Sequence, residues 1–186
     1  MRRLVSLVAV SVLACGCGPD STAQLTTPSI SAIVEPTYPN VNPGERPPVR
    51  PADALSDAGA KAFAVYFVKT IDWAYASMDT TLLEAASTAD CRVCGTFVKV
   101  ITNRRALGDV YSGSRITVLG AMVFNGPTDE TRLVNVAFSY TELYIRHPDG
   151  STEFDEGAHD LVQLNVRVRF ASDAWATYEA KRVVTE

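Results

Sequence analysis

The sequence predicts an α+β fold in which three N-terminal helices pack on a curved, four-stranded antiparallel sheet. Two observations lead to this class. Apolar residues recur at helical spacing from about residue 56 to residue 107, and from residue 115 onward they alternate as in strands. The turn sequences NGPTD and HPDG separate or end the strand-like runs, which favours antiparallel pairing of neighbouring strands.

The first predicted helix begins after Ser56, a favourable N-cap residue, and runs to about Ser77. Lys61, Lys69 and Asp72 lie away from its apolar face. That face is formed by residues at the 3, 4, 7 spacing of one helix side: Phe63, Tyr66, Phe67, Ile71, Ala74, Tyr75 and Met78.

Two further helices are expected. A short one, starting at Asp79 or Thr80, covers TTLLEAAS and depends on apolar contacts of its leucines. Asp90 is expected to cap the third, which runs from Cys91 to Leu107 before a left-handed glycine, Gly108. One side of this third helix carries Phe97, Val100, Ile101 and Arg104.

Four strands are expected at residues 115–124, 132–145, 161–170 and 175–184. The third alternates most clearly, because its apolar and polar residues fall on opposite faces of a strand. The helices are expected to cover the apolar face of the sheet, so the folded domain is placed at residues 52–186. The apolar positions of the third strand are Val162, Leu164, Val166, Val168 and Phe170.

Residues 1–17 have the pattern of a lipoprotein signal peptide. Two arginines precede an apolar run, which ends in ACGCGPDS and is shorter than the about 20 residues that a membrane-spanning helix needs. VLAC and ACGC both resemble the bacterial lipobox, which implies cleavage before the cysteine and diacylation of its sulfur. Cys15 is favoured because Val12 and Leu13 precede it, and Cys17 is the alternative. Two acyl chains would hold the mature protein on the extracytoplasmic face of the cell membrane.

Residues 18–51 are predicted to be a disordered, proline-rich tether. They hold eight of the ten prolines, separated by serine, threonine and asparagine. Proline removes backbone donors and favours extended conformers, so this composition does not build a helix or a ladder. A proline-rich ligand for an aromatic-lined groove is the alternative.

The composition excludes several classes of function. The chain has a formal net charge of −4 and no basic stripe, so nucleic acid is not an expected partner. It contains no glycine-rich phosphate loop, no G-x-S-x-G and no H-E-x-x-H, and no cofactor is predicted.

The expected arrangement, with helices in the concave side of a curved sheet, resembles the cone fold of the cystatin-like or SnoaL-like superfamily. Residues 66–94 also resemble a family of uncharacterised actinobacterial lipoproteins. Met78 occupies a turn position where that family more often has glycine, and the resemblance implies no known activity. The matching positions are Tyr66, Trp73, Ala74, Asp79, Leu82 or Leu83, Ser87, Cys91 and Cys94.

Cys91 and Cys94 are interpreted first as a disulfide. Residues three apart on a helix have Cα atoms about 5 Å apart, within the range that a disulfide needs. The compartment implied by the lipobox is oxidising. A redox pair at a helix N-terminus, a metal site and free thiols remain alternatives. The redox interpretation lacks a preceding buried strand, and the metal interpretation lacks further ligands, since His147 and His159 are the only histidines.

His159 is the one weak catalytic candidate. Asp155, Glu156 and Asp160 are close to it in sequence and would orient a general base or bind a cation, although a solvated loop is the expected state of this segment. His147 lies in a hairpin turn and is expected to be exposed. Ionisable strand residues are expected to face outward.

Two functions are compatible with these features of the sequence. The first is a non-catalytic envelope module that binds a small apolar molecule or an envelope protein. The alternative is a SnoaL-like small-molecule enzyme that uses a pocket acid or His159.

Overall fold

The structure, a computed structural model, describes residues 40–42, 44–113 and 115–183. They belong to a compact unit of residues 36–186. The predicted signal peptide and lipobox, with Cys15 and Cys17, and most of the predicted tether lie outside the described residues. No helix within the described ranges is long and apolar enough to cross a membrane.

Three helices come first: α1 (Asp57–Ser77), α2 (Thr81–Ala85) and α3 (Arg92–Ala106). Ser56 caps α1 as predicted, because its side chain accepts a hydrogen bond from the Gly59 N–H at 3.1 Å. The predicted apolar face of α1 is buried, with Tyr75 partly so. The three predicted helices are therefore confirmed.

The start of α3 differs from the prediction. Cys91 is its N-cap, and the Sγ atom accepts a hydrogen bond from the Cys94 N–H, so Asp90 does not cap the helix. The reason is a turn at residues 88–91, in which the Cys91 N–H donates to the Thr88 carbonyl. The helix therefore begins one residue later than predicted. Val100, predicted on the inner side, is exposed because α3 buries only a narrow stripe.

The predicted four-stranded antiparallel sheet is confirmed. It consists of β2 (Ile116–Asn125), β3 (Thr131–Tyr140), β6 (His159–Ala171) and β7 (Ala174–Val183), in that spatial order. A second, three-stranded sheet was not predicted from the sequence. It has the order β1 (Val110–Ser112), β4 (Leu143–Arg146) and β5 (Thr152–Glu156).

The second sheet arises because the predicted strand 132–145 is interrupted. The hydroxyl of Thr141 donates to the Gly113 carbonyl at 3.1 Å and accepts from the Arg115 N–H at 3.2 Å. These hydrogen bonds fix the connection between β3 and β4 to the segment that precedes β2. As a result β4 pairs with β1 and β5 and does not continue the pairing of β3 with β6. The acidic segment FDEGAHDL (residues 154–161), predicted to be a solvated loop, instead ends β5 and begins β6.

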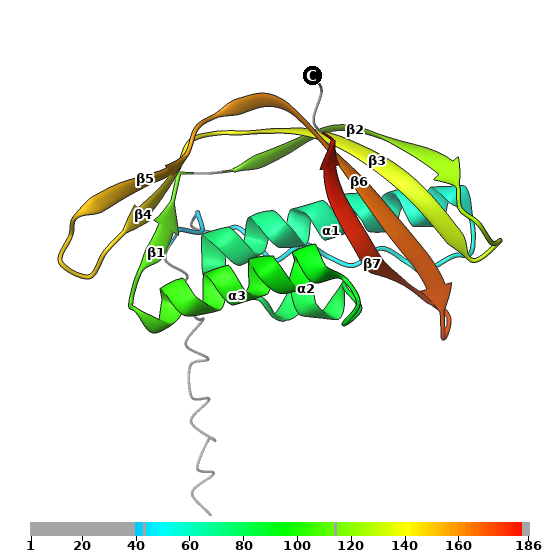
Figure 1. Cartoon of the computed structure of the whole chain (residues 1–186), viewed down its shortest axis with the longest axis horizontal. Helices are drawn as coiled ribbons and strands as arrows, with labels where there is room; N and C mark the ends of the chain where they lie inside the picture. Colours follow the sequence, from blue (N-terminus) through cyan, green and yellow to red (C-terminus); the bar gives the residue numbers. More distant parts are fainter. Residues whose placement is uncertain (1–39, 43, 114, 184–186) are drawn as a thin grey trace, which may run out of the picture. The chain divides into compact units, whose positions relative to one another are not determined.

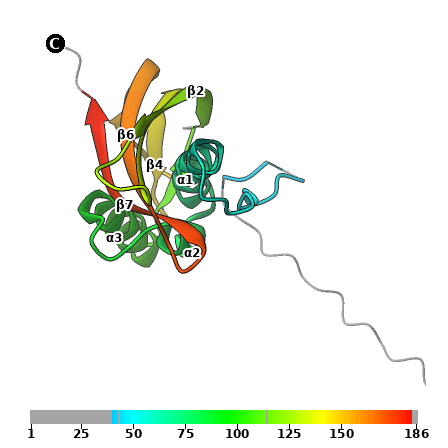
Figure 2. The ribbon, with the colours of Figure 1, turned by 90° about the vertical axis from the view of Figure 1, so that its right-hand side faces the viewer.

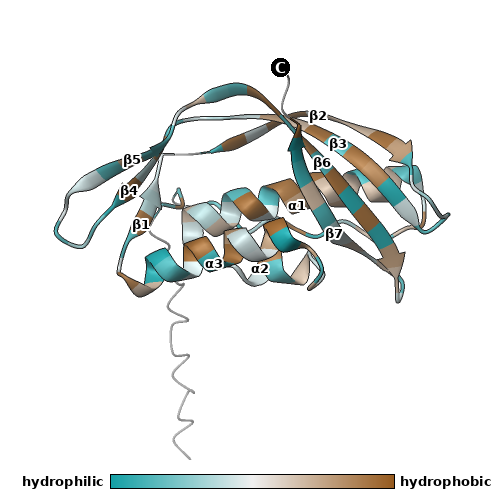
Figure 3. Cartoon of the chain, in the orientation of Figure 1, coloured by the Kyte–Doolittle hydropathy of each residue, from teal (hydrophilic) through white to brown (hydrophobic). Residues whose placement is uncertain are grey.

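The four-stranded sheet arches over α1 and α3, which lie on its concave side (Figures 1 and 2). Hydrophobic and hydrophilic residues alternate along β6 (Figure 3), and its apolar residues Val162 to Val168 are the buried ones. The centre of the core is formed by fully buried valines of β3 and β6: Val134, Val136, Val166 and Val168.

Residues 44–54, here called the N-terminal strap, contact the folded unit, although residues up to 51 were assigned to the tether. Arg50 donates to the Trp175 carbonyl at 2.6 Å, and its guanidinium lies 4.8 Å from the centre of the Phe63 ring. The Trp175 Nε1–H donates to the Ala54 carbonyl at 2.7 Å. A Cβ on Gly59 would lie 2.1 Å from that same carbonyl oxygen, so this approach requires glycine.

A second contact joins the strap to the helices and the sheet. Arg115 donates to Glu45 at 2.7 Å and to Asp72 at 3.0 Å. Asp72 also accepts from the Ile116 N–H at 2.8 Å. The hydrogen bond from Arg115 lowers the pKa of Glu45 below its ordinary value. Asp72, predicted away from the core face, is therefore enclosed by an ion-pair cluster at the start of β2.

Candidate functional site

A cavity of about 280 Å³ lies between the helices and the concave face of the sheet. Each of α1, α3 and β2 to β7 contributes to its wall. All of the lining residues are aliphatic or aromatic except one carboxylate and one guanidinium. They are Ile71, Tyr75, Val93, Phe97, Ile116, Phe138, Tyr140, Leu143, Glu156, Val162, Leu164 and Arg182.

The cavity is apolar in its depth and charged at its opening. The buried part of the wall includes Ile71, Phe138 and Leu164, each no more than 7% exposed. Glu156 and Arg182 are 44% and 46% exposed at their side chains and therefore mark the mouth. A ligand in this cavity would meet hydrocarbon inside and polar groups only where it reaches solvent.

The polar groups at the mouth are bonded to one another. Arg182 lies 3.3 Å from Oε1 of Glu156, and the Tyr140 hydroxyl donates to the same oxygen. We call Glu156 and Arg182 the mouth pair. Burial and the hydrogen bond to Glu156 raise the pKa of Tyr140 to about 12. Tyr140 is therefore a neutral donor at physiological pH.

Tyr75 forms an aromatic part of the wall. Its ring packs edge-on to Tyr111 at a centroid distance of 4.8 Å and to Phe97 at 6.3 Å. Burial raises the pKa of Tyr75 well above its ordinary value. The hydroxyl is therefore uncharged and gives the cavity no nucleophile.

His159 stands beside the mouth but does not line the cavity. Its Nε2 atom is 3.8 Å from Oε1 of Glu156, and its ring centroid is 5.0 Å from that of Tyr140. The side chain is 41% exposed. Of the acidic residues predicted around it, Glu156 lines the cavity, and Asp155 and Asp160 do not.

Arg182 is the site residue that the sequence did not predict. Ionisable strand residues were expected to face outward, but Arg182 pairs with Leu164 in the ladder and shares its inward face. A register shift in β7 between Thr177 and Glu179 changes the alternation and turns Arg182 inward. The sequence carries no local signal for this position, because the register shift appears only once β7 is paired with β6.

His147, predicted to be exposed, belongs to a separate cluster. Its Nδ1 atom is 2.8 Å from Asp109, and its Nε2 atom is 3.5 Å from Glu153. Arg104 lies 3.2 Å from the same Asp109 carboxylate. The turn at residues 148–150 is exposed as predicted, but the His147 side chain is only 28% exposed because β4 and β5 place it over the end of α3.

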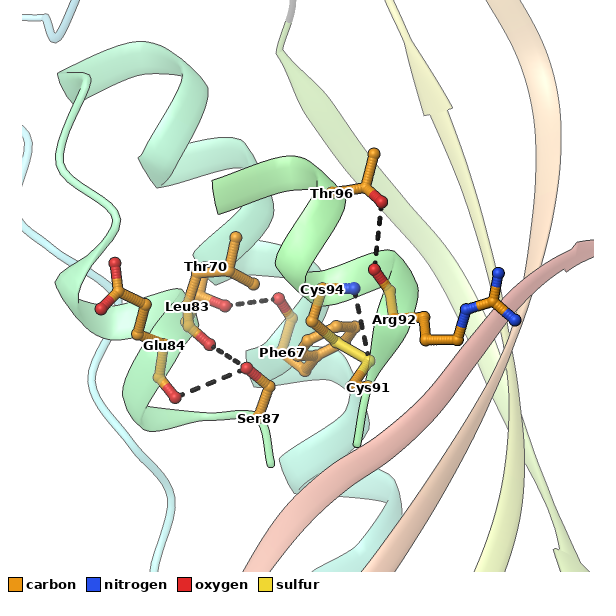
Figure 4. Close-up of a disulfide and its surroundings, with 9 residues drawn as sticks. All are labelled: Phe67, Thr70, Leu83, Glu84, Ser87, Cys91, Arg92, Cys94 and Thr96. Carbon is orange, nitrogen blue, oxygen red and sulfur yellow. Dashed lines mark hydrogen bonds between the residues drawn. A yellow bond between two sulfur atoms is a disulfide. The ribbon is translucent and has the colours of Figure 1, made fainter. Parts of the chain in front are cut away.

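The two predicted disulfide cysteines lie at the start of α3 (Figure 4). Their Sγ atoms are 1.97 Å apart and their Cα atoms 5.2 Å apart. Both residues are buried, and Figure 4 places the pair beside Phe67 and Leu83. Within the described part of the chain, no group of three or more histidine, cysteine, aspartate or glutamate residues could hold a metal ion.

Comparison with known proteins shows the fold only. No protein-family model matches the chain, and no curated protein matches its sequence. Among solved structures, the intermembrane space region of the chloroplast protein ARC6 is 13% identical with a TM-score of 0.50, covering 70% of this chain and 98% of that one.

Two further structures are less similar. A protein assigned as the β subunit of an aromatic-ring-hydroxylating dioxygenase from Novosphingobium aromaticivorans has 12% identity and a TM-score of 0.42, covering 69% of this chain and 92% of its own. A protein assigned as a polyketide cyclase from a Silicibacter species has 9% identity and a TM-score of 0.36, covering 64% and 86%. The chain therefore shares an α+β fold with the ARC6 region.

Proposed function

We propose that this protein is a lipid-anchored, extracytoplasmic binding module with a SnoaL-like cone, whose cavity takes a small apolar molecule. The observation that carries the proposal is the apolar cavity of about 280 Å³ with its single charged mouth. Sites for small ligands are concave, mostly apolar and furnished with a few polar groups. The resemblance of the N-terminal segment to a lipobox supports the proposed extracytoplasmic localisation.

The arrangement of polar groups favours binding over catalysis. Oε1 of Glu156 is bonded to both Arg182 and Tyr140, so this carboxylate already has partners within the site. His159 lies outside the lining and is partly solvated. A general base must reach the proton that it abstracts, and both side chains are more than 40% exposed to solvent.

Binding can be tested by isoleucine methyl NMR of the folded unit titrated with n-octanol. We expect the methyl signals of the cavity residues Ile71 and Ile116 to shift. Those of Ile101 and Ile145, which are buried elsewhere, should not. Val162→Phe, which fills the cavity, should abolish the shifts, and the exposed Leu119→Phe should retain them. No shift at Ile71 or Ile116 would contradict the proposal and leave an envelope protein as the partner.

The anchor needs its own experiment. We expect the mature protein from its native host to begin with a diacylated cysteine, at Cys15 or alternatively at Cys17, and to fractionate with membranes. Mass spectrometry of the N-terminal peptide distinguishes the two positions. Protein with an unmodified N-terminus in the soluble cytoplasmic fraction would contradict the proposed localisation.

The enzyme remains the second candidate, because the Glu156 and His159 side chains meet at the mouth. The reaction would be proton transfer on a bound carbon acid. Deuterium uptake from D₂O by a small 1,3-diketone, followed by NMR, tests it. Uptake that is lost in both Glu156→Gln and His159→Ala would support catalysis, and uptake equal to that of the buffer would exclude this reaction.

A further inference from the structure

The mouth pair also indicates what kind of head group a ligand carries, an inference that rests on the proposed function of the cavity. We propose that the cavity selects an uncharged amphiphile with an apolar tail and a head that both donates and accepts hydrogen bonds, such as an alcohol. The tail would lie against the buried wall and the head beside Glu156 and Arg182.

The orientation follows from how the wall is divided. Both charged lining residues are at the exposed end of the cavity, and the buried lining residues Ile71, Phe138 and Leu164 offer only hydrocarbon and an aromatic ring. A polar head placed among Ile71, Phe138 and Leu164 would lose its hydration without gaining a partner. The same head at the mouth keeps both solvent and hydrogen-bonding groups within reach.

The exclusion of charge follows from the mouth pair itself. Arg182 lies 3.3 Å from Glu156, so each charge is already compensated. A carboxylate head would compete with Glu156 for the guanidinium of Arg182, and the negative charge of Glu156 would repel it. An ammonium head would compete with Arg182 for the carboxylate. In either case the charged head gives up its own hydration only to replace one member of an ion pair, and an exposed ion pair contributes no more than about 1 kcal/mol.

An uncharged head can hydrogen-bond to both members of the mouth pair while Glu156 and Arg182 remain bonded to each other. A guanidinium has five N–H donors, and a carboxylate has two oxygens, so each can bind a further group while they hold each other. At Glu156 the Oε1 atom holds Arg182 and Tyr140, which leaves Oε2 to accept from a hydroxyl head. The same hydroxyl can accept from Arg182.

The test compares three probes of equal tail length: n-octanol, octanoate and octylammonium. Binding to the folded unit at neutral pH is followed through the methyl signals of Ile71 and Ile116. We expect n-octanol to bind several times more tightly than either ion, because a charged head loses more hydration free energy than a hydroxyl on entering the cavity. Equal affinity of all three, or a preference for an ion, would overturn the head-group inference while leaving the proposed function in place. If none of the three binds, the proposed function itself fails.

Variants of the mouth pair give a sharper result. Glu156→Gln frees Arg182 and should move the preference to octanoate, whereas Arg182→Gln frees Glu156 and should move it to octylammonium. Glu179→Gln is the matched control, because Glu179 pairs with Arg167 at 3.4 Å at comparable exposure and lies outside the cavity lining. The control should keep the preference for octanol. An unchanged preference in both mouth variants would overturn the inference.

Discussion

The Nδ1 atom of His147 lies 2.8 Å from Oδ1 of the buried Asp109 carboxylate. Asp109 follows α3, and His147 follows β4, so this contact joins the helix end to the β4–β5 hairpin. Arg104 and Glu153 complete the cluster, with Arg104 3.7 Å from Glu153. The hairpin also carries Leu143 and Glu156 of the cavity, and the cluster therefore helps to position one wall of the site.

Replacing the Asp109 carboxylate should change how strongly acid destabilises the folded protein. The hydrogen bond from His147 holds the pKa of Asp109 below its ordinary value of 3.8. The stability that this carboxylate contributes is present above pH 3.8 and is lost as the pH falls through the lower folded value. Asp109→Asn should therefore lose less stability than the wild type below pH 4, although it is less stable at neutral pH.

Urea unfolding measured at several pH values from neutral to acid tests this difference. Asp160→Asn, at an exposed position, is the control and should follow the wild-type profile. Parallel profiles for Asp109→Asn and the wild type would contradict a role for this contact in acid stability.

The strap should detach when its ion pair is removed. Arg115→Ala takes away the partner of Glu45 and of Asp72, and the Asp72 side chain is only 13% exposed. We expect the free energy of unfolding to fall by about 2 kcal/mol and a glutamate-specific protease to cut faster after Glu45, since both arginines of the strap precede prolines that block trypsin. Arg167→Ala removes an exposed pair and should cost no more than about 1 kcal/mol, with unchanged cleavage. Equal cleavage rates in the two variants would show that Arg115 does not hold the strap.

Patterns within a single element were predictable from the sequence. The inward face of α1 and the alternation of β6 depend on local spacing, and both are as expected. The break at Thr141 was not predictable, because the hydrogen bonds that end β3 come from residues about 26 and 28 positions away. An apolar run alone does not reveal which strand it will pair with.

The site was less predictable than the fold for the same reason. Glu156 was named only as one of three acidic residues near His159. Its partner Arg182 is 26 residues later and faces inward only because of a register shift. Asp72 was predicted to lie away from the apolar face of α1 because of its helical spacing, and His147 was predicted to be exposed because it lies in a hairpin turn. In both cases a distant arginine or carboxylate supplies the partner that makes burial possible.

The cysteine pair should be oxidised and moderately stabilising. Thiol counting on the folded unit without reductant should find no reactive thiol at Cys91 or Cys94. Because the closed loop is short, the Cys91→Ala/Cys94→Ala double variant should lose only about 1 to 2 kcal/mol of unfolding free energy. Two reactive thiols in the native protein would exclude the disulfide. A loss far above this range would show that packing against Phe67 and Leu83 dominates.

At Met78 an unfavourable backbone conformation is opposed by favourable burial of the side chain. Met78 ends α1 in the left-handed conformation, with φ 60°, and its side chain is only 3% exposed. A left-handed residue other than glycine costs about 1 kcal/mol, whereas removing a buried methionine side chain costs at least about 2 kcal/mol. Packing is the larger effect, so Met78→Gly should be destabilising although glycine suits this backbone.

The comparison with alanine separates the two effects. Met78→Ala loses the same packing and keeps the backbone cost, so it should be about 1 kcal/mol less stable than Met78→Gly. This is the reverse of the order expected inside a helix, where glycine is worse than alanine. Urea unfolding followed by circular dichroism measures the order directly. If the alanine variant were the more stable, the turn after α1 would have to relax out of the left-handed conformation, and the path into α2 would change with it.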